Sequence, residues 1–264
     1  MAEKSVEECI VTALDVNDIS LLPYIPYILQ DFWDIGTPPD EIIAIITKHT
    51  NHSGLTVLDL GSGKGAVSIQ LAKELQCTCL GIDALEDFVV FSRSKAVEYN
   101  VSDLCIFETN DIRSGLPALG TYDVIVLGAI GPVFGNYHDT LTQLKPHLNN
   151  NGIIIINDAY VHADYNAHPH PDILRMEDIL KQSESAGMQL IDIVADDDTC
   201  DDVSGLDEEF KIELKNITKR CMELADTYPE KKQLFLGFIA HQTREYQRLS
   251  NEVVPAIFVF TSAN

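Results

Sequence analysis

The stretch Val57-Leu58-Asp59-Leu60-Gly61-Ser62-Gly63-Lys64-Gly65 decides the fold. An apolar run that is typical of a buried strand ends at Leu60, glycines at alternate positions follow, and residues 66–75 have the pattern of a helix. Glycines allow a tight turn and leave no Cβ between the backbone and a ligand. The free N–H groups at the start of the helix favour a negative group. The stretch therefore predicts a strand, a ligand-binding turn and a helix.

Strand-like and helix-like segments alternate outward from this turn. Apolar strands are expected at 56–60, 78–83, 104–109, 122–128, 152–158 and 188–194. Helices are expected between them, at 66–75, 85–100, 137–148 and 173–186. Near-continuous apolar strands separated by helices indicate a parallel sheet that is covered on both faces. We therefore expect a doubly wound α/β fold, with a last strand at 254–262.

Two regions outside this alternation have a helical pattern. Residues 1–50 form the first, with a helix start at Thr37-Pro38-Pro39-Asp40. Residues 207–250 form the second, in which apolar side chains recur at helical spacing until Pro229 separates two helices. We expect residues 1–50 to be an N-terminal helical cap segment. Residues 51–264 are expected to be one Rossmann-like domain with a helical cap insertion at 207–250.

The charge of the chain limits its partners. The 264 residues include 41 acidic and 18 basic side chains, which gives a net charge of −23. Such a field repels a phosphate backbone and an anionic membrane surface, so neither nucleic acid nor membrane is an expected partner. No apolar run approaches the ~20 residues of a spanning helix. The cysteines form no Cys-x-x-Cys pair and the N-terminus has no secretory pattern, which favours a cytoplasmic protein with reduced thiols.

Asp83 adds a second element of a nucleotide site. It ends the strand that follows the glycine turn, where a carboxylate is placed to accept both hydroxyls of a ribose. A Walker A loop is excluded, because Lys64 is followed by Gly65 rather than by Ser or Thr. A dinucleotide fingerprint tolerates the spacing Gly61-x-Gly63-x-x-Ala66. An NAD-dependent oxidoreductase therefore stays open as an alternative.

A more specific resemblance is to the class I S-adenosylmethionine (SAM)-dependent methyltransferases. Asp59-x-Gly61-x-Gly63-x-Gly65 resembles their motif I, and Gly81-Ile82-Asp83-Ala84 resembles the segment with their acidic ribose ligand. Asn110-Asp111-Ile112 resembles the segment beside adenine, residues 122–126 resemble the fourth strand, and Leu144-Lys145-Pro146 resembles the turn before the fifth. In that turn His147-Leu148-Asn149 replaces the usual glycines. The resemblance covers roughly residues 35–195.

This resemblance implies a seven-stranded, mostly parallel sheet whose last strand, 254–262, is antiparallel. It implies SAM as the cofactor and S-adenosylhomocysteine as its product. The cofactor-binding residues it implies are Asp59, Gly61, Ser62, Gly63, Gly65, Asp83, Ala84, Asn110, Asp111, Ile112, Leu127 and Gly128. The helices before the first strand and between the sixth and seventh are similar to those of the UbiE/type 11 and cyclopropane-synthase-like groups. In those groups such helices cap the acceptor pocket.

Motifs that would name a macromolecular or catechol acceptor are missing. Gly128-Ala129-Ile130-Gly131-Pro132 follows the fourth strand, where base methylases resemble one another in a (D/N)PP(Y/F) motif and catechol-type enzymes have an Asp. No cysteine lies between Cys105 and Cys200, so the Pro-Cys of RNA C5-methylases is absent. We therefore expect a methyltransferase that acts on a small molecule. The alternative from another class is a SAM-binding module without catalysis of its own.

Methyl transfer from a sulfonium requires alignment and exclusion of water more than stabilisation of charge. Side chains at the carboxyl end of the fifth strand are the best candidates for catalysis, namely Asp158, Tyr160 and His162. The candidates for acceptor binding are Tyr24, Tyr27, Trp33 and His138. The nearby His168 and His170 have no known ligand spacing, so no metal is expected. Residues 192–209 carry nine acidic side chains, which either favour a cationic acceptor or form a solvated loop. The oligomeric state is not predicted.

Overall fold

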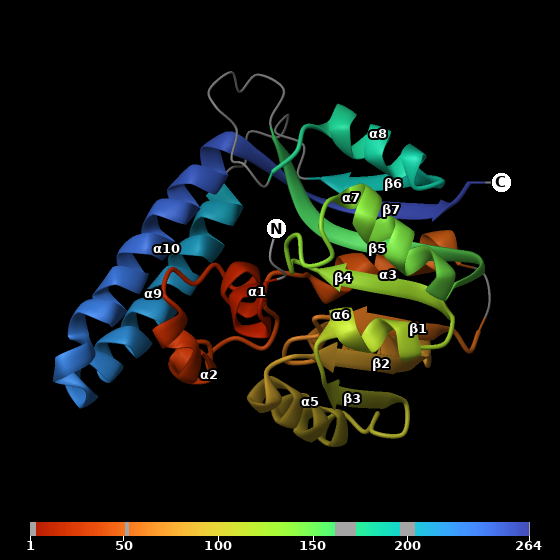
Figure 1. The fold of residues 1–264 in the computed structure, drawn as a ribbon. Coiled ribbons are helices and arrows are strands. Elements are labelled where there is room, and N and C mark those ends of the chain that lie inside the picture. The colour runs from red at the N-terminus through yellow and green to blue at the C-terminus, as the bar shows by residue number, and fades with distance from the viewer. Residues whose placement is uncertain (1–3, 51–52, 162–172, 196–203, 264) are drawn as a thin grey trace.

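The computed structural model describes residues 4–50, 53–161, 173–195 and 204–263 (Figure 1). A seven-stranded sheet has the order β3-β2-β1-β4-β5-β7-β6. Strands β1 to β5 are parallel, and β7 is antiparallel to both β5 and β6. The bounds are β1 Thr56–Leu60, β2 Thr78–Asp83, β3 Cys105–Thr109, β4 Tyr122–Gly128, β5 Leu148–Val161, β6 Met188–Ala195 and β7 Val253–Ser262. The predicted mostly parallel sheet with one antiparallel strand is confirmed.

Helices cover both faces of the sheet, as the apolar character of the strands requires. One buried cluster joins the sheet to α3, α4 and α5 through Ile45, Ala72 and Val89. The other joins it to α7 and α8 through Leu141 and Ile179. The bounds are α3 Pro39–His49, α4 Ala66–Leu75, α5 Glu86–Glu98, α6 Ile112–Gly115, α7 Tyr137–Leu144 and α8 Met176–Ser185.

One boundary differs from the expected one. The helix expected at 137–148 ends at Leu144, and β5 begins at Leu148, which pairs with Tyr122. The register shifts beyond this pair, and Asn149 Nδ2 donates to Asp123 Oδ1 at 2.9 Å. The strand therefore contains a bulge rich in asparagine, which conceals its first residues from an apolar pattern.

The remaining helices form a third cluster at one side of the sheet. They are α1 Val6–Ala13, the 3-10 helix Ile19–Tyr24, α2 Ile25–Ile28, α9 Ser204–Thr227 and α10 Lys232–Glu252. Ser5 caps α1 in a reciprocal capping box with Glu8. Figure 1 shows α9 and α10 lying side by side, with α1 and α2 between this pair and the strands. Buried contacts among Leu21, Ile28, Cys221 and Phe235 hold the two regions together. Within the described residues, no helix is long and apolar enough to cross a membrane.

Candidate active site

A cavity of about 940 Å³ opens where β1, β2 and β4 end. Gly61 and Gly63 from the turn after β1, Asp83 from β2 and Gly128 from β4 form one wall. The segment 29–38, α1, α9, α10 and the start of β7 form the others. Its volume lies near the upper end of the ~300–1,000 Å³ that is typical of small-molecule sites. The cavity therefore offers room for a nucleotide-sized cofactor and a second molecule.

The glycine turn has the backbone shape that a ligand site requires. Gly61, Gly63 and Gly65 have φ of +75°, +52° and +75°. A Cβ on Gly65 would lie 2.8 Å from Ser92 Cβ, so this glycine is needed for packing against α5. A Cβ on Gly63 would meet no protein atom within 4 Å, and the residue lines the cavity. Gly63 is therefore the point at which a ligand can approach the backbone closely.

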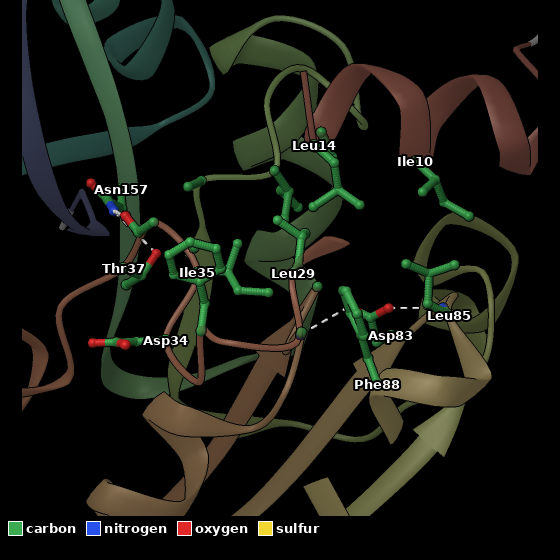
Figure 2. Close-up of a pocket in the computed structure, with 18 of the residues that line it drawn as sticks. Ile10, Leu14, Leu29, Asp34, Ile35, Thr37, Asp83, Leu85, Phe88 and Asn157 are labelled. Atoms are coloured by element: carbon green, nitrogen blue, oxygen red, sulfur yellow. Dashed lines mark hydrogen bonds between the residues drawn. The ribbon is translucent and has the colours of Figure 1, made fainter. Parts of the chain in front are cut away.

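Asp83 holds this turn and also faces the cavity (Figure 2). Its Oδ2 accepts from the Gly63 N–H and its Oδ1 accepts from the Leu85 N–H, both at 2.8 Å. Burial raises the pKa of the Asp83 carboxyl, and the backbone donors partly offset this effect. A carboxylate oxygen has two acceptor positions, so each oxygen can accept one more hydrogen bond. The residue thus fits the two hydroxyls of a ribose.

Asp59 lies beneath the turn, beside a smaller pocket that Ser62 also lines. It is 2% exposed, and its Oδ2 accepts from Ser68 Oγ at 2.6 Å. Burial raises the pKa of Asp59 to about 6. Ser62 Oγ is the one buried side-chain N or O atom without a hydrogen-bond partner among the residues the structure describes. Such an atom is costly unless a ligand or water satisfies it, so this part of the site also fits a bound molecule.

The wall beyond Asp83 comes from the segment after β3. Asn110, Asp111 and Ile112 line the cavity. Asp111 caps α6 by accepting from the Arg113 N–H at 3.0 Å, and its carboxylate also pairs with the Arg113 guanidinium. It therefore shapes this wall, while Asn110 and the buried Ile112 present polar and apolar surface. Taken with Gly63, Asp83 and the unpartnered Ser62 Oγ, these residues fit SAM.

A segment of residues 29–37, which we call the strap, passes over the glycine turn. Lys64 is 4% exposed, and its Nζ donates to the carbonyl oxygens of Leu29 and Phe32, the latter at 2.6 Å. Trp33 Nε1 donates back to the Lys64 carbonyl at 3.1 Å. Burial lowers the pKa of Lys64 to about 8. The strap is thus fastened to the turn by the residue that sequence reasoning used only to exclude a Walker A loop.

Asn157 fastens the far end of the strap. Its Nδ2 donates to the Gly36 carbonyl at 2.6 Å and to Thr37 Oγ1 at 3.1 Å (Figure 2). On the outer side, Asp31 forms a two-pronged ion pair with Arg220 of α9, at 2.6 and 2.7 Å. The strap therefore connects the glycine turn to the helices on the opposite wall. Its partners are mostly backbone carbonyls, for which a sequence carries no signal.

Most predicted cofactor residues meet at this site. The cavity lining contains Trp33, Gly61, Gly63, Asp83, Ala84, Asn110, Asp111, Ile112 and Gly128. Asp59 and Ser62 line the smaller pocket beside it. Gly65 and Leu127 lie behind the site, the first against Ser92 and the second in the buried core.

Several other candidates lie elsewhere. Tyr24 packs on Phe235, 5.1 Å between ring centroids, and Tyr27 is 41% exposed and donates to Glu223 at 2.8 Å. His138 Nδ1 lies 2.8 Å from Ser185 Oγ on α8. None of these three lines the cavity. Their predicted role in acceptor binding stays a prediction that the geometry does not support.

The residues at the end of β5 divide between two faces. Asn157 lines the cavity, whereas Asp158 Oδ2 accepts from Tyr137 Oη of α7 at 2.9 Å. Successive strand residues point to opposite faces, so Tyr160 lies on the side of Asp158, with its ring against Phe258. Neither Asp158 nor Tyr160 lines the cavity. His162 lies outside the described residues, and within them no group of His, Cys, Asp or Glu is arranged to hold a metal.

Comparison with known proteins identifies the domain. Residues 51–171 match the family model of a methyltransferase domain. No curated protein matches the sequence. The structure is similar to SAM-dependent methyltransferases solved with S-adenosylhomocysteine. That of Geobacter sulfurreducens has a TM-score of 0.72 and 17% identity, covering 91% of this chain and 98% of that one. For that of Thiobacillus denitrificans the values are 0.74, 17%, 90% and 98%.

A cyclopropane synthase from Mycobacterium tuberculosis is also similar, with a TM-score of 0.69 and 13% identity, covering 97% of this chain and 98% of that one. The match extends over nearly the whole of both chains, and so it includes the helices outside the sheet. The chain therefore has the fold of the class I SAM-dependent methyltransferases, and residues 51–171 are a methyltransferase domain. The resemblance that motif I indicated is confirmed.

Proposed function

We propose that this chain, whose residues 51–171 are a methyltransferase domain, transfers the methyl group of SAM to a small-molecule acceptor. One observation carries the proposal. A single cavity joins the glycine turn and Asp83 to a space walled by α1, α9 and α10. A binding module without catalysis would need only the first half of this cavity. The second half gives an acceptor a place beside the cofactor.

SAM supplies a methyl group on a sulfonium, which leaves as a neutral thioether. Gly63 gives the cofactor close approach to the backbone, and Asp83 accepts from the ribose hydroxyls. Asn110 and Ile112 flank the base. The carboxylates of Asp59 and Asp83 place negative charge around a cofactor that is itself cationic at its sulfonium and amino groups. S-adenosylhomocysteine, the product, keeps the same contacts except those to the sulfonium.

The task that remains for the protein is alignment and exclusion of water. Holding two reactants in a productive arrangement is worth ~7–11 kcal/mol. The strap lies between the glycine turn, which Lys64 links to it, and the helices on the opposite wall, which Arg220 links to it. We propose that residues 1–50 and 207–250 act together as one cap that closes the acceptor side. Their common buried cluster, which includes Leu21 and Cys221, supports this grouping.

Calorimetry and a transfer assay test the proposal. The purified chain is titrated with SAM, S-adenosylhomocysteine and NAD, and SAM and S-adenosylhomocysteine are expected to bind while NAD does not. Preference for NAD would support the oxidoreductase alternative instead. The chain is then incubated with methyl-labelled SAM and a small-molecule extract, and mass spectrometry follows the label. Label in a small-molecule product supports the enzyme, whereas tight SAM binding without any turnover across extracts would favour the binding module.

A further inference from the structure

The half of the cavity away from the glycine turn has mainly apolar walls. We call it the acceptor chamber, and it rests on the proposed function. Its walls include Ile10 and Leu14 of α1, Ile217 of α9, Phe238 of α10 and Ile257 of β7. Figure 2 shows the side chains of Ile10, Leu14 and Leu29 directed toward the space that faces Asp83. Walls of this kind bind the apolar body of a molecule by removing it from water.

The charged side chains of the cavity are all acidic among its described lining residues. They are Asp31, Asp34, Glu41, Asp83, Asp111 and Glu213. Asp31 and Asp111 are neutralised by Arg220 and Arg113, and Asp83 belongs to the cofactor side. Glu213, on α9, supplies negative charge to the chamber itself. An acceptor that carries its own carboxylate or phosphate would be desolvated next to that charge, which is unfavourable.

Glu213 lies beside two aromatic rings that also line the cavity. Tyr246 Oη donates to Glu213 Oε2 at 3.1 Å. Burial and the neighbouring Glu213 charge raise the pKa of Tyr246, so the phenol keeps its proton. Phe210 stacks on the Tyr246 ring with 5.0 Å between centroids and 27° between planes. A carboxylate at the edge of stacked rings is the arrangement that attracts an ammonium group, because charge pairing and cation–π attraction act together.

We propose that the acceptor is an apolar amine, whose ring-sized body fills the acceptor chamber and whose ammonium group is recognised by Glu213, Tyr246 and Phe210. The apolar walls select the body and the acidic, aromatic wall selects the charge. This wall belongs to α9 and α10, which lie outside the methyltransferase domain of residues 51–171. Acceptor choice is thereby separated from cofactor binding.

Matched probes test the inference on the full chain saturated with S-adenosylhomocysteine. Tryptamine, tryptophol and indole-3-propionate share one ring and one spacer but end in an ammonium, a hydroxyl and a carboxylate. Calorimetry should rank tryptamine tightest and indole-3-propionate at least about ten-fold weaker. Glu213→Gln should weaken tryptamine by about ten-fold and leave tryptophol nearly unchanged. The control Asp226→Asn, on the exposed end of α9 and outside the cavity lining, should change neither.

Each other outcome has a defined meaning. If the chain fails to bind S-adenosylhomocysteine, the proposed function itself falls. If S-adenosylhomocysteine binds but indole-3-propionate binds as tightly as tryptamine, or no probe binds, the inference is overturned while the proposed function stands. An unchanged preference in Glu213→Gln also overturns it. Should that variant lose its thermal transition, Phe210→Leu replaces it, because loss of the ring should weaken tryptamine more than tryptophol.

Discussion

The Gly63 N–H donates to Asp83 Oδ2 at 2.8 Å, across 20 residues of sequence. The two positions that a nucleotide-binding pattern singles out as ligands of the cofactor therefore also hold each other in place. Asp83 fixes the shape of the glycine turn before any ligand binds. Preorganisation of this kind lowers the ordering cost of binding. It also means that a change at Asp83 affects both the contact to the ribose and the turn.

Asp83→Ala is expected to weaken SAM binding by about 10- to 150-fold. The variant loses hydrogen bonds to a charged acceptor, each worth ~1.5–3 kcal/mol, and leaves the Gly63 N–H without its partner. Asp87→Ala is the control, because Asp87 is exposed in the first turn of α5. Calorimetry with both variants measures the effect. Equal affinity in Asp83→Ala and the original chain would remove Asp83 from the cofactor site.

Gly63→Ala is expected to abolish SAM binding without unfolding the chain. The new Cβ meets no protein atom within 4 Å but occupies space in the cavity. Gly54→Ala is a matched control, since Gly54 also has a positive φ, of +76°, and open space at its Cβ, but does not line the cavity. Both variants should lose roughly 1 kcal/mol of stability from the positive φ. Thermal unfolding compares their stabilities and calorimetry their SAM affinities; loss of binding in both would contradict the prediction.

SAM affinity is expected to fall as the pH drops through about 6, the raised pKa of buried Asp59. Above this pH the carboxyl is ionised and attracts the cationic cofactor, whereas below it the charge is lost. The decrease should be on the order of five-fold, or about 1 kcal/mol. Titrations across this pH range with the original chain and with Asp59→Asn measure it. The Asn variant should lack the step, and a step that persists in it would assign the titration to another group.

The same carboxyl makes a prediction about stability. Its folded-state pKa lies above the ordinary value of 3.8, so between about pH 4 and 6 the folded chain binds more protons than the unfolded one. The contribution of Asp59 to stability therefore falls as the pH rises through this window. Asp59→Asn, which can still accept from Ser68, should remove that part of the pH dependence. Urea unfolding at several pH values gives the free energies for this comparison.

The sheet and the cofactor residues could be predicted from sequence, because both depend on local patterns. Apolar strands identify themselves, and Gly61, Gly63 and Asp83 follow strand ends that parallel pairing brings to one edge. The division at the end of β5 depended on which face each residue takes, so Asp158 pointed to α7 and Asn157 to the cavity. Position at a strand end fixes the edge of the sheet but not the face.

The strap could not be predicted from sequence for a different reason. Lys64 donates to backbone carbonyls of residues that lie about 30 positions earlier, and carbonyls carry no residue identity. The Phe210, Glu213 and Tyr246 wall likewise combines two helices whose facing sides are set only by packing. Helical spacing identified the buried stripe through Ile217 and Cys221. It gave no information on the side chains beside that stripe.

Lys64→Met is expected to loosen the strap and weaken S-adenosylhomocysteine binding while the sheet stays folded. Methionine keeps most of the buried apolar body but removes the donors to the Leu29 and Phe32 carbonyls. Hydrogen exchange should increase at residues 29–37 and stay unchanged in β1 and β4. Lys73→Met is the matched control on α4, since Lys73 Nζ pairs only with the adjacent Glu74 at 3.1 Å in an exposed position. Increased exchange in both variants would point to a general effect of charge.

The pH dependence of stability gives Lys64 a second, independent signature. Burial lowers its folded-state pKa from 10.5 to about 8, so between these values the unfolded chain holds the proton and the folded chain does not. Stability rises with pH wherever the unfolded state binds more protons, and Lys64 should therefore add a stabilising slope from about pH 8 to 10.5. Lys64→Met should lack this slope and Lys73→Met should keep it, in urea unfolding at matched pH values. If the slope survives in Lys64→Met, then the ammonium is solvated in the folded chain and the strap is held by Trp33 and Asn157 instead.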